Sequence, residues 1–106
     1  MGLREIQDDV ERLVNEEWGA GYWEPLSTLA RATEELGELA REINDRFGGR
    51  VKKSGEDTQD IGIEICDILF ALVCMANSQG ISLDEAWKSM MSKYRKRDNK
   101  RFERKE

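Results

Sequence analysis

An apolar segment in the second half of the chain constrains the fold more than any other feature. From Ile61 to Ala76 the residues are apolar almost without exception, and two carboxylates, Glu64 and Asp67, interrupt them. The segment predicts a helix over about 58–79 that is apolar on nearly every side, and a single small bundle rarely buries such a helix completely. We therefore expect a second copy of the chain to cover it, in a homodimer or, as a dimer of dimers, in a homotetramer.

The composition favours a single all-α domain that spans residues 1–106. The chain has 39% hydrophobic residues, 37% charged residues and one proline, which suits long helices with exposed charged faces better than a two-sided sheet. No basic region precedes an apolar core at the N-terminus, and no apolar run reaches the ~18 residues of a membrane span. We expect a cytoplasmic protein that has no membrane partner.

Hydrophobic periodicity predicts three further helices, which complete a four-helix bundle. The first covers about 3–18, the second 25–47, and the last begins beside Ser82, where Ser82 and Glu85 match a capping box. The polar stretch 50–57 reads as a loop, and residues 98–106 as a frayed basic tail. In the second helix, seven residues at helical spacing are expected to point inward: Leu26, Leu29, Ala30, Leu36, Ala40, Ile43 and Phe47.

The cysteines and the missing histidine limit the chemistry. Cys66 and Cys74 lie two helical turns apart, about 12 Å along the axis, which is too far for a disulfide within one helix. We interpret both as small buried hydrophobes, and Trp18 and Trp87 as core residues that continue apolar stripes. The absence of histidine excludes a Ser-His-Asp triad, the common zinc sites and a di-iron bundle.

Charge is distributed unevenly along the chain. The net charge is −5, yet residues 88–106 contain nine Lys and Arg against three acids, so that this end carries +6 and residues 1–87 carry −11. A nucleic-acid binder normally spreads its basic charge over one face of the fold. We therefore expect no nucleic-acid partner.

Two pairs of carboxylates are spaced to meet across one gap. Glu64 and Asp67 lie at i and i+3 on one helix face, as do Glu35 and Glu38 on the second helix. If the two helices pack antiparallel, the repulsion between the pairs calls for a hard divalent cation such as Mg²⁺, which takes oxygen ligands. Considered alone, the acids of the second helix fit a solvated face better than a metal site, because Arg31, Arg41 and Arg46 lie among them.

These residues carry a resemblance to a known family. Glu34-Glu35-x-x-Glu38 followed by Glu64-x-x-Asp67 resembles the EExxE…ExxD signature of the MazG-like, all-α nucleoside triphosphate pyrophosphohydrolases. The flanks GYWEPLSTLARATEELGELAREIN and EICDILFALVCMANSQGISLDEAWKSMMSKYRKRD are similar to the short single-domain branch of that family, so the likeness covers about Gly21 to Asp98.

The resemblance implies a Mg²⁺-dependent enzyme, with Mn²⁺ as a substitute, that clears unwanted nucleotides from the cellular pool. Its substrate would be a nucleoside triphosphate, cleaved between the α and β phosphates into the monophosphate and pyrophosphate. Carried over by position, the catalytic residues are Glu34, Glu35 and Glu38, with Glu34 as the general base or as the residue that orients the attacking water. The metal ligands are Glu35, Glu38, Glu64 and Asp67, while Lys93 and Arg97 would meet phosphate, and Asn77 the sugar or a phosphate.

Base recognition and two rival functions rest on weaker patterns. Tyr22 and Trp23 lie at the junction of the first two helices, where an aromatic ring could stack on a base, so we name Trp23 as a substrate-binding candidate. One alternative is a non-catalytic regulatory bundle that binds a nucleotide without cleaving it. The other is a nucleic-acid module that uses the stretch KYRKRDNKRFERK as its contact surface.

Overall fold

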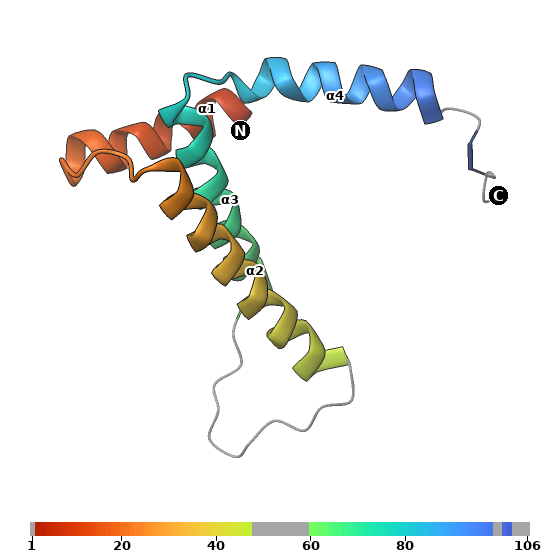
Figure 1. The fold of residues 1–106 in the computed structure, drawn as a ribbon, viewed down its shortest axis with the longest axis horizontal. Helices are drawn as coiled ribbons and strands as arrows, with labels where there is room; N and C mark the ends of the chain where they lie inside the picture. Colours follow the sequence, from red (N-terminus) through yellow and green to blue (C-terminus); the bar gives the residue numbers. More distant parts are fainter. Residues whose placement is uncertain (1, 48–59, 99–100, 103–106) are drawn as a thin grey trace.

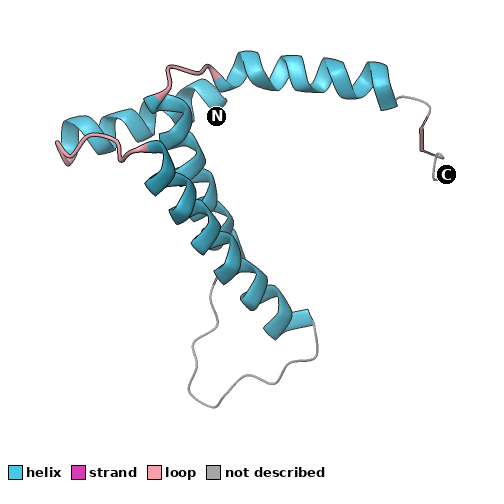
Figure 2. Cartoon of the chain, viewed as in Figure 1, coloured by secondary structure: helices cyan, strands magenta, loops and turns pink. Residues whose placement is uncertain are grey.

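The computed structural model describes residues 2–47, 60–98 and 101–102 (Figure 1). This part of the chain is helical and contains no strand, which confirms the all-α prediction (Figure 2). The predicted loop 50–57 and most of the tail 98–106 lie outside the described residues. In chain order the elements are α1 (Leu3–Glu11), the π-helix η1 (Arg12–Glu17), α2 (Pro25–Phe47), α3 (Ile61–Ser78) and α4 (Leu83–Asp98).

Local signals in the sequence fix most helix ends. Pro25 is the first residue of α2, where its missing N–H costs no hydrogen bond. The Asp60 carboxylate caps α3 by accepting from the backbone N–H of Gly62 at 2.7 Å, so α3 begins later than predicted. At the start of α4, Ser82 Oγ accepts from the Glu85 N–H at 3.3 Å, which confirms the serine half of the capping box.

The last turn of the first helix is a π-helix, which the sequence analysis did not predict. Trp18 N donates to Leu13 O at 2.8 Å, five residues back, so this turn holds one residue more than an α-helical turn. Gly19 and Gly21 follow with φ of 64° and 72° and lead the chain into α2. A Cβ at either position would meet no atom within 4 Å, so the backbone conformation and not the available space calls for glycine.

The helices form an antiparallel pair and two arms rather than a closed bundle. Helices α2 and α3 run antiparallel side by side, α1 packs against α3, and α4 starts beside α1 and extends away from the pair (Figure 1). The radius of gyration is 17.6 Å, whereas a compact domain of this length has about 13 Å. The buried core is small: Val10, Val14 and Val73, with Ile6, Tyr22, Phe70, Cys74 and Leu83 packed against it.

The predicted inward face of α2 was wrong for a single chain. All seven of those residues are exposed, Leu26 by 81% and Phe47 by 75%. The buried residues of α2, the helix that packs along α3, are instead Thr28, Ala32, Glu35 and Glu42. Trp18, Trp87 and Cys66, expected in the core, are exposed as well, because one chain offers no further element to cover them.

Helix α3 is long and apolar enough, by length and composition alone, to cross a membrane, which the sequence analysis did not anticipate. The core helix of a soluble protein meets the same criterion. In this chain α3 packs along α2 and against α1, and its buried residues are Glu64, Ala71, Val73 and Ala76.

Candidate functional site

Three carboxylates converge where α2 faces α3. One oxygen each from Glu35 of α2 and from Glu64 and Asp67 of α3 lie within 4.8 Å of one another. Glu35 and Glu64 are buried and Asp67 is exposed, so the group opens to solvent on one side. The antiparallel packing therefore brings acids of both predicted pairs together.

Glu64 is the most strongly perturbed of these acids. Its side chain is buried, with 3% of the residue exposed, and Oε2 has no hydrogen-bond partner in the described part of the chain. Burial raises the pKa of Glu64, and the nearby charges of Glu38, Asp67, Glu35 and Glu42, in that order, raise it further. The site is thus short of positive charge around one buried oxygen.

This donor set fits a hard divalent cation. Carboxylate oxygens are the ligands that Mg²⁺ prefers, and a cation would satisfy the otherwise unpartnered Oε2 of Glu64. Glu38 is exposed and is not among the three clustered acids, yet its charge acts on Glu64. Glu34 is exposed on the same helix, one residue before Glu35.

A pocket of about 380 Å³ extends from the carboxylates to the turn between η1 and α2. Glu35 and Asp67 line it together with aromatic side chains and Arg31. The full lining is Val14, Trp18, Ala20, Gly21, Tyr22, Trp23, Thr28, Arg31, Glu35, Asp67, Phe70, Ala71 and Cys74. One cavity thus combines an acidic part with an aromatic part, which suits a ligand that is apolar and flat at one end and coordinates a cation at the other.

The aromatic residues of this pocket differ in how they are held. Trp18 meets Phe70 edge-on, with ring centroids 6.3 Å apart and an interplanar angle of 63°. Trp23 is mostly exposed, as a ring that stacks on a ligand requires. Tyr22 is fixed by hydrogen bonds, and burial, followed by its bond to Glu11, raises its pKa to about 12.

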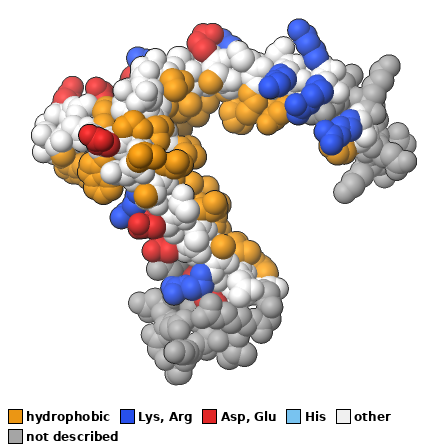
Figure 3. All heavy atoms as spheres, viewed as in Figure 1, with side chains coloured by type: hydrophobic (Ala, Val, Ile, Leu, Met, Phe, Trp, Pro, Cys, Tyr) orange, Lys and Arg blue, Asp and Glu red, His pale blue; other side chains and the backbone are white. Residues whose placement is uncertain are grey.

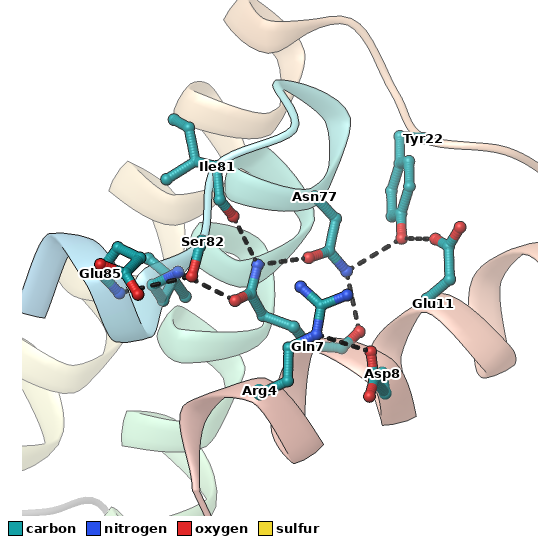
Figure 4. Close-up of polar contacts among 10 residues, drawn as sticks. Arg4, Gln7, Asp8, Glu11, Tyr22, Asn77, Ile81, Ser82 and Glu85 are labelled. Carbon is teal, nitrogen blue, oxygen red and sulfur yellow. Dashed lines mark hydrogen bonds and ion pairs between the residues drawn. The ribbon is translucent and has the colours of Figure 1, made fainter.

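Asn77 belongs to a polar network that joins α1, α3 and the start of α4 (Figure 4). Its Nδ2 donates to the Gln7 backbone oxygen and to the Tyr22 hydroxyl oxygen, both at 3.0 Å, and that hydroxyl donates to Glu11. Gln7 Nε2 in turn donates to Asn77 Oδ1 and to Ile81 O, both at 2.8 Å. The structure therefore places the Asn77 amide between Gln7 and Tyr22.

Lys93 and Arg97 are not brought to the carboxylates within one chain. Both are exposed on α4, which extends away from the α2–α3 pair, and Lys and Arg side chains gather on its distal half (Figure 3). The Arg97 guanidinium lies over the Tyr94 ring, 5.7 Å from its centroid. Several residues that line the pocket were not predicted as site residues, among them Phe70 and Arg31, although Arg31 is spaced at i, i+4 from Glu35.

Comparison with known proteins gives consistent matches. A family model, the MazG nucleotide pyrophosphohydrolase domain, matches residues 23–102. YpjD of Bacillus subtilis (strain 168), a protein of uncharacterised function, is 49% identical over 104 residues, which are 98% of this chain and 93% of YpjD.

Two solved structures share the fold over most of their length. The crystal structure of YpjD from Bacillus subtilis, described as a candidate pyrophosphatase, has a TM-score of 0.80 and 46% identity, and the match covers 92% of this chain and 97% of that one. The crystal structure of the Bacillus-conserved MazG protein, a nucleotide pyrophosphohydrolase, has a TM-score of 0.74 and 37% identity, and covers 92% and 94%.

Proposed function

Because the chain belongs to the MazG nucleotide pyrophosphohydrolase family and is a hydrolase of nucleotide pyrophosphate bonds, we propose that it cleaves nucleoside triphosphates between the α and β phosphates. Water adds across that bond, and the products are a nucleoside monophosphate and pyrophosphate. The observation that carries the proposal is the cluster of Glu35, Glu64 and Asp67 at the wall of a pocket that is aromatic elsewhere. Family membership favours this reaction over a regulatory bundle that only binds nucleotide.

The acids provide the place for a divalent cation, Mg²⁺ with Mn²⁺ as a substitute. Glu35, Glu64 and Asp67, joined by the nearby Glu38, would hold it. When bound, such an ion acts as a Lewis acid on phosphate oxygens and lowers the pKa of coordinated water. Glu34 is exposed beside this group, so its carboxylate is free to accept the proton of the attacking water, the role that we assign to it.

The aromatic part of the pocket would hold the nucleobase. Trp18 and Phe70 form one edge-to-face wall, and Trp23 presents an exposed ring beside it, so a base could lie against π-surfaces without direct hydrogen-bond readout. The Asn77–Tyr22 bond holds the Tyr22 ring at the same wall. In this proposal Asn77 touches the sugar or phosphate only if its amide gives up one of these bonds.

We further propose that the active form is a homodimer or homotetramer. Exposed apolar residues cover α2 and α3, among them Leu29, Leu36, Ile65 and Leu72. Hydrophobic side chains also border the open angle between α4 and the α2–α3 pair (Figure 3). A second copy would cover this surface and could bring the Lys93 and Arg97 of one chain to the phosphates held by another.

The cellular setting follows from the same reaction. An enzyme that removes pyrophosphate from nucleoside triphosphates acts where the nucleotide pool is, so we place it in the cytoplasm, without a membrane or nucleic-acid partner. Its role there would be to clear unwanted nucleotides.

The test is pyrophosphate release from a panel of canonical and damaged ribo- and deoxynucleoside triphosphates, with Mg²⁺ and with EDTA. The proposal expects metal-dependent release of pyrophosphate and monophosphate by the wild type, and none by Glu64→Gln, a variant that keeps the shape of the side chain but removes its charge. Release of inorganic phosphate in place of pyrophosphate would move the cleaved bond to the γ phosphate. Nucleotide binding without any turnover would support the regulatory bundle.

A further inference from the structure

Arg31 and Glu35 form the shortest ion pair of the described residues. Arg31 Nε lies 2.9 Å from Glu35 Oε1, one helical turn further along α2. The side chain of Glu35 is 7% exposed and that of Arg31 is 55% exposed, so a buried carboxylate is paired with a cation that reaches solvent. Glu35 is also one of the three clustered acids.

Arg31 is in addition the single Lys or Arg among the described residues that line the pocket. A triphosphate in this pocket would carry several negative charges past Glu35 and Asp67 and would need cations close to its oxygens. Helix α4 carries its lysines and arginines away from this place in the same chain (Figure 1). Among the described residues, Arg31 is therefore the basic residue that is already positioned at the pocket.

We propose that Arg31 binds the phosphates of the nucleotide, and that its pair with Glu35 is the resting arrangement which it leaves to do so. Without a divalent cation, the guanidinium neutralises Glu35. Once Glu35 is engaged by Mg²⁺, Arg31 is released and turns toward the phosphate oxygens. This inference rests on the proposed function, since it assumes a metal-bound nucleotide in the pocket.

The exchange agrees with the energetics of the two partners. A buried carboxylate that loses its only counter-charge is strongly destabilised, so Glu35 needs either Arg31 or a metal ion. Arg31 itself is half exposed, so water can solvate the guanidinium when it leaves, provided that a cation takes over the neutralisation of Glu35. A guanidinium then gains charge-assisted, bidentate hydrogen bonds to phosphate, which are stronger than its bond to one carboxylate oxygen.

The first arm of the test measures metal binding without nucleotide. Mn²⁺ is titrated into the wild type and Arg31→Ala, and free Mn²⁺ is followed by electron paramagnetic resonance. Because Arg31 competes with the ion for Glu35, Arg31→Ala should bind Mn²⁺ about 2- to 5-fold more tightly. Arg41→Ala, which removes the same charge from the same helix away from the pocket lining, should bind Mn²⁺ as the wild type does. Weaker Mn²⁺ binding by Arg31→Ala would mean that Arg31 supports Glu35 as a ligand, and would overturn the exchange.

The second arm measures the nucleotide. For the substrate that the panel identifies, Arg31→Ala should raise KM by roughly 10-fold or more, the effect of losing a charged hydrogen bond, and Arg31→Lys should recover part of it. An unchanged KM would overturn the phosphate contact.

Binding of a non-hydrolysable α,β-methylene triphosphate, measured by calorimetry with Mn²⁺, separates this inference from the reaction. If the wild type binds the analogue and Arg31→Ala binds it more weakly, the Arg31 contact stands even where no turnover is found. Equal binding by both proteins rules the contact out, whatever the wild type hydrolyses.

Discussion

Gln7 and Asn77, seventy positions apart in the sequence, exchange a pair of hydrogen bonds. Gln7 Nε2 donates to Asn77 Oδ1 at 2.8 Å, and Asn77 Nδ2 donates to the Gln7 backbone oxygen at 3.0 Å. Gln7 Oε1 also accepts from the Leu83 N–H at 3.0 Å, so one buried side chain joins α1 to the end of α3 and to the start of α4. This network fixes where α4 leaves the body of the molecule.

Asn77→Ala is expected to destabilise the chain by about 1–3 kcal/mol, because it removes these bonds and leaves buried polar atoms of Gln7 unsatisfied. Urea unfolding followed by circular dichroism measures the change. Asn15→Ala is the matched control, since Asn15 is exposed and, among the described residues, its side chain bonds to Glu11 alone, so the midpoint should move little. A normal midpoint for Asn77→Ala, together with a raised KM, would instead favour contact with the substrate.

Glu64 should make the metal-free protein less stable as the pH rises. Its pKa is raised in the folded state above the ordinary value of 4.5, so between these two values the folded chain binds more protons than the unfolded chain. The stability contributed by the protonated form is complete below pH 4.5 and is lost as the pH passes the raised pKa. Glu64→Gln should therefore unfold at a higher temperature than the wild type in EDTA at neutral pH, with the advantage shrinking toward pH 4.5. The control variant Glu16→Gln, at an exposed position, should unfold at the same temperature as the wild type at each pH. If Glu64→Gln raises the unfolding temperature by the same amount at every pH, titration of Glu64 is excluded as the cause.

Asp67→Asn and Glu38→Gln are expected to abolish pyrophosphate release while the helix content stays unchanged. Each removes a negative charge that acts on Glu64, so the bundle should remain folded and gain thermal stability in EDTA. Activity assays and thermal melts of the same preparations check both statements. Full activity in either variant would remove that residue from the site.

Leu36→Glu should convert an oligomer into single chains. Leu36 is exposed by 56% in one chain and lies outside the buried core, so the substitution places a charge on the exposed apolar face of α2. Size-exclusion chromatography with light scattering should give a mass of two or more times 12.2 kDa for the wild type, and a mass of 12.2 kDa for the variant. The matched control is Glu34→Gln, which alters the exposed part of the same helix without adding charge. A wild type of 12.2 kDa at all concentrations would rule out the oligomer.

Lys93→Ala is expected to raise KM with little change in kcat, because it weakens phosphate binding outside the acidic cluster. If Lys93 serves the site of another copy, mixing Lys93→Ala chains with Asp67→Asn chains should restore some sites that contain both the Asp67 of one chain and the Lys93 of the other. Activity should then exceed that of either variant alone at subsaturating nucleotide. Additive activity in the mixture would mean that Lys93 does not act across an interface.

Features that depend on local sequence were predictable, and those that depend on a partner surface were not. The bounds of α2 follow from Pro25 and the glycines after Phe47, and the meeting of Glu35 with Glu64 and Asp67 follows from helical spacing and antiparallel packing. The apolar stripe that includes Leu26 and Leu36 shows that some surface must cover it, but spacing alone cannot say whether that surface lies in the same chain.

The arrangement at the pocket depends on geometry that no motif encodes. Trp18 follows the π-helix and lines the pocket, whereas its place in the apolar period predicted a core position. Asn77 and Gln7 are ordinary polar residues in the sequence, and their pairing depends on how α1 crosses α3. Arg31 reads as part of a solvated face until the burial of Glu35 is known.

The two glycines that lead from η1 to α2 separate the backbone path around the pocket from the side-chain surface that lines it. Gly19 and Gly21 set the path of the backbone through their φ angles, while the side chains next to them, Trp18 and Trp23, form the surface that a ligand meets. A Cβ at either glycine would meet no atom within 4 Å beyond its chain neighbours, so the turn rests on the φ angles of the glycines and not on side chains packed against these positions. Evolution, or a protein engineer, can therefore exchange Trp18 or Trp23 to alter ligand preference while the turn itself is inherited unchanged.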